Sequence, residues 1–251
     1  MKSPKHIYYK SKGQFKGIDA TVLKLIAVIT MLIDHIGASF IEEGLQRSAA
    51  FNQETYYYIN NIDLLFRAIG RVSFPIFCFL IVEGFFKTKN LKKYLIRMIA
   101  FSVISEIPFD MAFSNTFFDF DYQNVFCTLS IGLIAMTLIQ RQENIIMKIA
   151  TGAVCAAGAQ LLGTDYGAYG VVLILGFYFL YRMKFSKEML SCVMIALESS
   201  FPRMLIPIGI CASSLYLYNG ERGKGMKYFF YVFYPAHLFV LGLILHICFR
   251  N

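Results

Sequence analysis

The feature that most constrains this chain is a series of apolar runs separated by short charged segments. A helix needs about 20 apolar residues to cross the hydrocarbon core of a bilayer. Of the 251 residues, 57% are hydrophobic and 16% are charged, which excludes a soluble, disordered or fibrous protein. The runs cover residues 20–41, 64–86, 93–113, 124–140, 145–163, 168–183, 188–200, 203–218 and 228–249. The sequence therefore predicts an all-α protein, a polytopic transmembrane helical bundle of about nine helices.

The segments between these runs alternate in charge, and this alternation predicts the orientation of the chain. Residues 1–17 contain lysines and no acid, so we expect a basic cytoplasmic tail. Segment 42–63 is mainly acidic and is expected as an outer loop, whereas residues 87–93 are rich in lysine and are expected inside. We predict an integral protein of the plasma (inner) membrane, with its N-terminus in the cytoplasm and residues 18–251 as a single transmembrane domain. Membrane topology explains the net charge of +8, so no nucleic-acid partner is expected.

Polar residues within the apolar runs are the first functional candidates, because a charge at the bilayer centre costs about 3 kcal/mol on insertion scales. Most of these polar residues fall toward the expected outer side. The residues on that side are Asp34, His35, Arg67, Arg71, Glu106, Asp110, Asn124, Asp165 and Tyr166. One interpretation is a set of buried ion pairs that fixes helix register. The interpretation we favour is a polar cavity open to the outside, in which a histidine acts as a base and two arginines on one helix face handle negative charge.

Spacing along the helices suggests which carboxylate orients the histidine. Asp34 precedes His35 directly, and adjacent residues on a helix point about 100° apart, so Asp34 is poorly placed for this role. Glu106 and Asp110 share a face of the third span and reach the same side of the bundle. We therefore expect one of these two carboxylates to orient the His35 ring.

A second group of polar residues lies toward the expected inner side. Glu83, Tyr234 and His237 fall there, and a single histidine in an aromatic helix is more often a packed residue than a catalyst. The basic residues of this side are Lys87, Lys89, Lys92, Lys93 and Arg97. These side chains would suit the phosphates of a cofactor, and they equally satisfy the rule that cytoplasmic loops are basic. The sequence leaves both interpretations open.

Several short motifs, taken in order, resemble the TraX family of membrane proteins. They are Leu23–Ala27 running into Met31–Gly37, Gly70–Phe77 with Glu83-Gly84, Ser105–Asp110, Asn124-Val-Phe, Asp165–Gly167 and Tyr234–His237. The resemblance covers about residues 17 to 245. The founding member of that family is associated with N-terminal acetylation of conjugative pilin. The family also resembles multi-span acyltransferases that pass acetyl groups from cytoplasmic acetyl-CoA to extracytoplasmic acceptors.

The resemblance implies an acyltransferase with acetyl-CoA as donor and an amine or hydroxyl as acceptor, on a protein N-terminus, a sugar or a lipid. His35 would be the general base, and an arginine or Asn124 would stabilise the oxyanion. The other catalytic candidates are Asp34, Arg67, Arg71, Glu106 and Asp110. The expected donor-binding residues are Lys87, Lys89, Lys92, Lys93, Arg97, Tyr234 and His237, and the expected acceptor-binding residues are Asn124, Asp165 and Tyr166.

Two other classes of function remain open at this level. A transporter or flippase would use the same charges as a substrate or proton pathway, but it predicts internal symmetry, and the sequence has no convincing repeat. A non-catalytic membrane scaffold would use the charges only to hold helices together. No metal site is predicted, because the histidines at 6, 35, 237 and 246 have no ligand spacing with one another or with cysteine.

Overall fold

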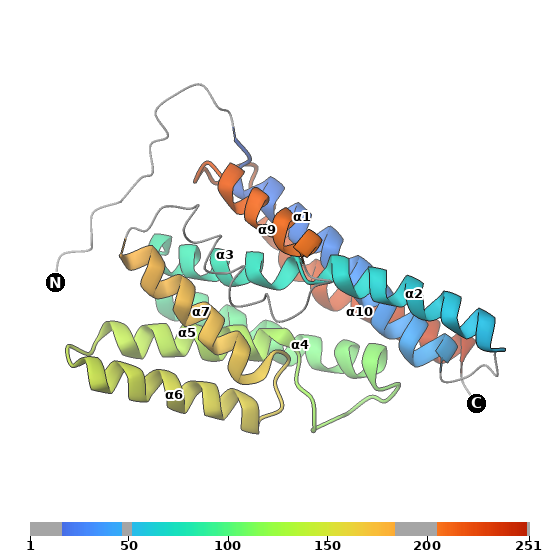
Figure 1. The fold of residues 1–251 in the computed structure, drawn as a ribbon. Coiled ribbons are helices and arrows are strands. Elements are labelled where there is room, and N and C mark those ends of the chain that lie inside the picture. Colours follow the sequence, from blue (N-terminus) through green and yellow to red (C-terminus); the bar gives the residue numbers. More distant parts are fainter. Residues whose placement is uncertain (1–16, 47–51, 184–204, 250–251) are drawn as a thin grey trace.

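The computed structural model describes residues 17–46, 52–183 and 205–249, which are almost entirely helical (Figure 1). Six helices begin and end close to the limits of predicted spans. They are α4 (Leu91–Phe113), α5 (Val125–Gln140), α6 (Ile145–Leu161), α7 (Gly167–Arg182), α9 (Leu205–Leu217) and α10 (Lys227–Cys248). The expected span 188–200 lies outside the described residues. The prediction of an all-α helical bundle is confirmed.

The first helix is longer than its apolar run. α1 (Ala20–His35) is capped by Asp19, whose carboxylate accepts the backbone N–H of Thr21 at 2.8 Å. The chain then continues as a π-helix, Ile36–Gln46, so α1 and this extension form one continuous rod. His35 is the last residue before the change in hydrogen bonding, a position where π-type turns are frequently functional.

The prediction that residues 42–63 form an outer loop is wrong for most of that segment. Residues 42–46 belong to the π-helix, and α2 (Gln53–Gly70) covers residues 53–63. Asn52 starts α2 by accepting the Thr55 N–H at 2.8 Å. The charges in this segment reduce its hydropathy, but they do not prevent a helix, because helix formation depends on backbone bonding and capping rather than on apolar character.

The predicted span 64–86 consists of two helices with a break between them. α2 ends at Gly70, and α3 (Ser73–Lys87) begins after a turn in which the Ser73 hydroxyl donates to the Gly70 carbonyl at 2.9 Å. Gly70 lies against α1: a Cβ atom there would come 2.1 Å from the Cβ of Asp34. The break therefore brings the end of α2 into direct contact with the end of α1.

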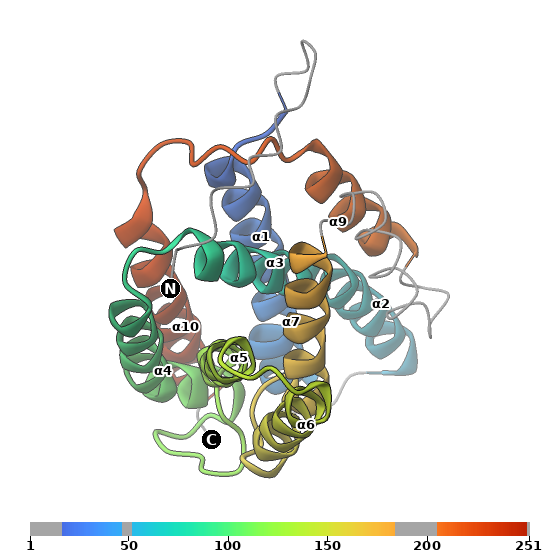
Figure 2. The same ribbon diagram turned by 90° about the vertical axis from the view of Figure 1, so that its left-hand side faces the viewer.

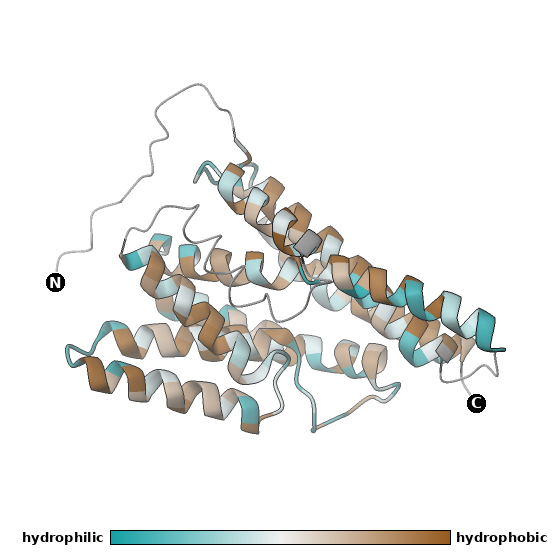
Figure 3. Ribbon diagram, viewed as in Figure 1, coloured by the Kyte–Doolittle hydropathy of each residue, from teal (hydrophilic) through white to brown (hydrophobic). Residues whose placement is uncertain are grey.

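Three helical stretches of the described chain are long and apolar enough to cross a membrane. They are Ala20–Leu45, Gln53–Lys87 and Tyr228–Cys248. Four shorter apolar helices accompany them: Val125–Gln140, Ile145–Leu161, Gly167–Arg182 and Pro207–Leu217. Hydrophobic residues dominate the helices, while hydrophilic residues gather in loops and at the N-terminal part of α2 (Figure 3). This distribution is that of a membrane protein.

Five helices form a closed ring when the bundle is viewed end-on (Figure 2). The ring runs α1, α3, α5, α4, α10 and back to α1, and each neighbouring pair is in contact. α6 and α7 pack outside the ring against α5 and each other, and α2 packs against α1 and the π-helix. Segments from the beginning and the end of the chain therefore line the same interior space.

The connection between α9 and α10 is fastened to the start of α1. The Ala20 N–H donates to the Glu221 carbonyl at 2.8 Å, and the Thr21 hydroxyl donates to the Lys224 carbonyl at 2.7 Å. Gly223 takes a φ of +66° and lies so close to Asp19 that only glycine fits. These contacts hold Arg222 at the N-terminal end of α1.

We expect Gly70→Ala to destabilise the protein, because the added methyl group would displace the Asp34 carboxylate from α2. Overpacking of this kind costs about 1–3 kcal/mol, which corresponds to a melting temperature lower by several degrees. Thermal unfolding in detergent measures the effect. Gly158→Ala on α6 is the matched control, since a Cβ there meets no atom within 4 Å. Equal melting temperatures for both variants would contradict the close approach of α1 and α2.

Candidate functional site

Charged and polar residues from several helices surround a cavity of about 410 Å³, here called the charged cavity. Its ionisable lining residues are Asp34, His35, Glu42, Glu43, Arg67, Arg71, Tyr122, Asp165, Tyr166 and Tyr234. Of the residues that the sequence pointed to, the structure brings together Asp34, His35, Arg67, Arg71, Asp165 and Tyr166. Helices far apart in the chain supply them, so the outward cluster expected from the sequence is a single site in space.

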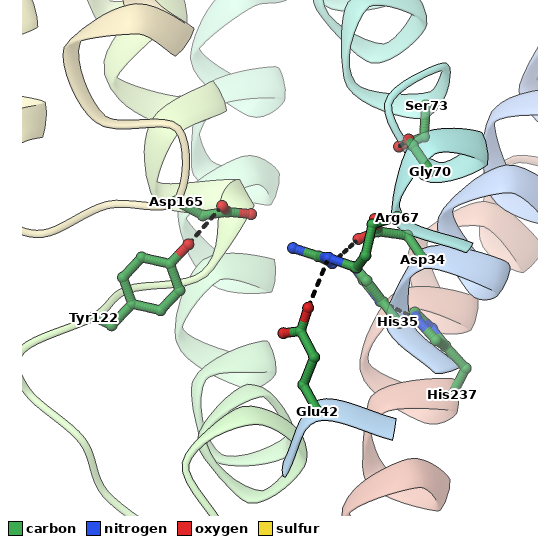
Figure 4. A network of polar contacts seen from close by, with 9 residues as sticks. All are labelled: Asp34, His35, Glu42, Arg67, Gly70, Ser73, Tyr122, Asp165 and His237. Atoms are coloured by element: carbon green, nitrogen blue, oxygen red, sulfur yellow. Dashed lines mark hydrogen bonds and ion pairs between the residues drawn. The ribbon is translucent and has the colours of Figure 1, made fainter. Parts of the chain in front are cut away.

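Arg67 is the ion-pair centre of the charged cavity. Its Nη1 donates to Asp34 Oδ2 at 2.7 Å, and its Nε lies 3.4 Å from Glu42 Oε1. Figure 4 shows the guanidinium reaching from the α1 side toward Asp165 and Tyr122 on the opposite wall. Arg71 lines the same cavity just after the end of α2, and within the described residues it forms no ion pair. Arg71 is therefore the cation of this cavity that can meet a ligand without first breaking an ion pair with a described residue.

The ring of His35 is held by a second histidine. His35 Nδ1 lies 2.7 Å from His237 Nε2, and His237 Nδ1 lies 2.7 Å from the Phe233 carbonyl oxygen. The two ring planes are 10° apart with centroids 5.0 Å apart, so the nitrogen contact runs along the ring edges, as an in-plane hydrogen bond requires. The pair is drawn in Figure 4.

The carbonyl at the end of this chain fixes the tautomers of the neutral pair. A carbonyl only accepts, so His237 Nδ1 must carry a proton and donate it. Its Nε2 then has a free lone pair and accepts a hydrogen bond from His35 Nδ1–H. His35 is left with an unprotonated Nε2, which is the form that a general base needs. Ordering by a hydrogen bond at the other ring nitrogen is the usual way in which proteins set a histidine's role.

The expectation that Glu106 or Asp110 orients His35 is therefore wrong. Both carboxylates face another part of the bundle: Glu106 accepts a short hydrogen bond from the Asn124 amide, and Asp110 accepts the Asp119 N–H at 2.9 Å. Neither lines the charged cavity. An i, i+4 stripe identifies a shared face but not the direction in which that face points, and α4 turns these residues toward α5 and the following loop.

Asn124 has a structural role that the sequence did not reveal. Its side-chain oxygen accepts the Phe126 N–H at 3.0 Å and so caps α5, and its amide nitrogen donates to the Ser102 carbonyl at 2.8 Å as well as to Glu106. The side chain is fully buried and does not line the charged cavity. Asn124 is thus occupied as the junction of α4 and α5, away from any acceptor in that cavity.

The wall opposite Arg67 consists of two loops that pair through the backbone. Asp165 donates its N–H to the Gln123 carbonyl at 2.8 Å, and the Tyr122 hydroxyl donates to Asp165 Oδ1 at 2.8 Å. Tyr166 follows with a φ of 65°, a strained conformation for an aromatic residue, and its ring stacks on Phe74 at a centroid distance of 3.6 Å. Burial raises the pKa of Asp165 to about 6, although the Tyr122 hydrogen bond opposes this rise.

A second cavity of about 430 Å³ lies toward the N-terminal end of α1 and is here called the basic cavity. Its walls are mainly aromatic and aliphatic, and its charged lining residues are Lys24, Glu83, Lys87, Arg97 and Arg222. The single carboxylate is already engaged: buried Glu83 accepts from Lys87 Nζ at 2.8 Å and from the Tyr218 hydroxyl at 2.8 and 2.9 Å. The cavity therefore has an excess of positive charge.

The basic residues predicted from the sequence divide into two groups. Lys87 and Arg97 line the basic cavity, whereas Lys89, Lys92 and Lys93 are exposed outside it. Sequence reasoning missed Lys24 and Arg222, which the ring of helices and the fastened α9–α10 connection bring to the same place. The position of Lys24, one turn inside the first apolar run, was the available signal, because a charged residue within a membrane span is costly and is therefore a functional candidate.

The two cavities share part of their lining. Met31, Phe77, Val125 and Tyr234 line both of them. Lys24 and His35 are 11 residues apart on α1, or about 16 Å at 1.5 Å per residue. The prediction that His237 lies with the basic residues at the inner end is wrong, because it contacts His35, while Tyr234 stands between the two cavities. His237 is ten residues after the first residue of α10, or about 15 Å along the helix, and so lies well away from the basic loop before it.

We expect Asp165→Asn to stabilise the protein more at pH 7 than at pH 5. The folded chain holds the Asp165 proton up to about pH 6, while the unfolded chain releases it near its ordinary pKa of 3.8. Ionisation therefore costs folding free energy as pH rises through this window, and asparagine avoids that cost while still accepting from Tyr122. Melting temperatures at both pH values measure the difference, with Asp121→Asn at an exposed position as control. A difference that does not change with pH would contradict the raised pKa of half-buried Asp165.

Comparisons with known proteins identify the family of this chain. A family model described as TraX protein matches residues 19–245. The chain is 30% identical over 242 residues to a protein of Dichelobacter nodosus described as probable fimbrial assembly protein FimC, serogroup H1, and the match covers 87% of this chain and 92% of that relative. No solved structure matches the chain. The resemblance seen in the sequence motifs is confirmed, and this chain belongs to the TraX family of membrane proteins.

Proposed function

We propose that this protein is a membrane-embedded acyltransferase that moves an acetyl group from acetyl-CoA to an amine or hydroxyl acceptor, with His35 as the general base. The observation that carries the proposal is the junction of the two cavities. A basic, otherwise apolar cavity and a cavity containing an ordered histidine share four lining residues. A donor with an anionic head, a long uncharged arm and a reactive end would use both cavities in that order.

The basic cavity has the chemistry expected for the donor. Three of its four cations, Lys24, Arg97 and Arg222, have no carboxylate partner among the described residues. The buried Nε of Arg97 also makes no hydrogen bond within the described part of the chain. Phosphate groups are the ligands that such cations favour. The volume of about 430 Å³ lies within the usual range for small-molecule pockets and suits an arm such as pantetheine. With the N-terminus in the cytoplasm, this cavity faces the compartment that contains acetyl-CoA.

The histidine pair supports a role in proton transfer. In the proposed reaction His35 Nε2 takes the proton of the attacking amine or hydroxyl, and the positive charge that results is shared through Nδ1–H with His237 and the Phe233 carbonyl. His237 is thus proposed as a positioning residue rather than a donor-binding one. The proton then passes to the sulfur of the leaving thiolate.

The charged cavity is proposed as the acceptor site, on the extracytoplasmic side. Arg71, Asp165 and Tyr166 line this cavity together with His35. Arg67 stabilises the cavity wall through ion pairs with Asp34 and Glu42. A protein N-terminus, a sugar or a lipid headgroup carries the amine or hydroxyl that this chemistry needs. The relative described as a fimbrial assembly protein makes a fibre subunit the first protein acceptor to test.

We expect purified protein to release CoA from acetyl-CoA, slowly with water and faster with an acceptor, and His35→Ala to reduce this rate at least about 100-fold, because general-base catalysis contributes that much or more. Free CoA measured by mass spectrometry gives the rate. His246→Ala, on α10 and outside both cavities, is the matched control and should retain full activity. Full activity of His35→Ala would remove this residue from the mechanism.

The residues at the mouth of the basic cavity allow a separate test of donor binding. Arg222→Gln should raise the KM for acetyl-CoA about tenfold with kcat unchanged, because a hydrogen bond to a charged group contributes about 1.5–3 kcal/mol. Lys89→Gln is the control, since Lys89 is exposed near the same end but does not line the cavity. Equal effects of the two substitutions would indicate general electrostatics instead of a built phosphate site.

A transporter is the second candidate, because the two cavities lie toward opposite ends of α1 and meet at shared residues. It predicts movement of a solute across proteoliposomes without release of CoA. Failure of a well-folded sample to bind acetyl-CoA at millimolar concentration would contradict the acyltransferase and favour transport. The charged cavity would then be tested as the substrate or proton site.

A further inference from the structure

Tyr234 occupies an unusual position for a tyrosine in an apolar helix. Its side chain is 4% exposed, and its hydroxyl oxygen is completely buried. The backbone N–H of Val125 interacts with this oxygen, and the hydroxyl proton has no acceptor among the described residues. Buried polar groups nearly always have hydrogen-bond partners, so a hydroxyl without an acceptor on a residue that lines a cavity points to an acceptor that arrives with a ligand.

The surroundings of Tyr234 place it at the meeting point of donor and base. It lines both the basic and the charged cavity, and its ring lies edge-on to His35 with centroids 6.0 Å apart. Phe126 packs edge-on against the other side at 5.1 Å and fixes the ring. A hydroxyl donor that is held by packing, shielded from water and close to the proposed base can stabilise developing negative charge.

We propose that Tyr234 is a catalytic residue whose hydroxyl donates a hydrogen bond to the carbonyl oxygen of the transferred acyl group. This inference rests on the proposed acyltransferase function and deepens it by assigning the oxyanion donor. The other candidates for this role are less suitable. Arg67 is held by Asp34 and Glu42, and Asn124 is held by Ser102, Glu106 and its own helix. Arg71 lines the charged cavity alone and not the junction with the basic cavity.

The step that Tyr234 assists is the attack on the thioester. The acceptor nitrogen or oxygen forms a bond to the acyl carbon, the C=O π electrons move to oxygen, and the acceptor proton goes to His35 Nε2. The Tyr234 O–H donates to this oxygen without losing its proton. When the C=O bond re-forms, the C–S bond breaks, and the sulfur receives the proton from His35. Charge on the oxygen is greatest between these two events, so the hydrogen bond is strongest there.

Tyr234→Phe tests the proposal because it removes only the hydroxyl group. We expect kcat for CoA release to fall about 100- to 1,000-fold, as for loss of one oxyanion donor in other enzymes, with the KM for acetyl-CoA within about twofold of wild type. The melting temperature should stay within a few degrees of wild type, because the hydroxyl has no described acceptor and only its interaction with the Val125 N–H is lost. Tyr228→Phe is the matched control: Tyr228 also lies on α10, is exposed, lines neither cavity, and should retain full kcat.

A spectroscopic measurement distinguishes the hydrogen bond from an indirect effect. The His35→Ala variant, with its slow turnover, allows the infrared carbonyl stretch of bound ¹³C-labelled acetyl-CoA to be recorded. This stretch should lie at lower frequency than in water-free solvent. The shift should disappear when Tyr234→Phe is added and persist with Tyr228→Phe. If the wild type turns over acetyl-CoA and Tyr234→Phe has the same kcat, the role of Tyr234 is wrong but the acyltransferase function stands. Absence of acetyl-CoA binding by folded wild-type protein would overturn both.

Discussion

Asp34 and His35, adjacent on α1, carry the contacts on which the candidate site depends. Because neighbouring helical residues point about 100° apart, one reaches Arg67 on α2 and the other reaches His237 on α10. Helices from the beginning and the end of the chain are thereby fixed around one cavity. Gly70 permits the first of these contacts, since any side chain there would collide with Asp34.

Charge is distributed unequally between the two cavities, so the two ends of the bundle interior differ in electrostatic character. Cations exceed carboxylates in the basic cavity, whereas the charged cavity combines two arginines with several carboxylates and the histidine pair. Electrostatic interactions are stronger in such low-dielectric surroundings than in water, so each unpaired group there favours a ligand of matching chemistry. Tyr234 lines both cavities and so lies where the two environments meet.

Much of the fold could be predicted from the sequence, but less of the site. The limits of α4, α5, α6 and α7 follow from apolar runs, because an apolar run of sufficient length has few alternatives to a helix in a membrane. α2 was missed because its first half is polar and was interpreted as a loop. Spacing also failed for Glu106, since the periodicity of one helix does not say how that helix is rotated relative to its neighbours.

The sequence by itself determined the all-α membrane class, the family and the identity of the polar residues that needed an explanation, because burying charge in lipid is costly wherever the helices lie. Only the tertiary structure decided which of these residues meet. The pairing of His35 with His237, 202 positions apart, and the recruitment of Lys24 and Arg222 to one cavity depend on the order of helices around the ring. That order is set by side-chain packing between helices, which hydropathy and spacing along one helix do not encode.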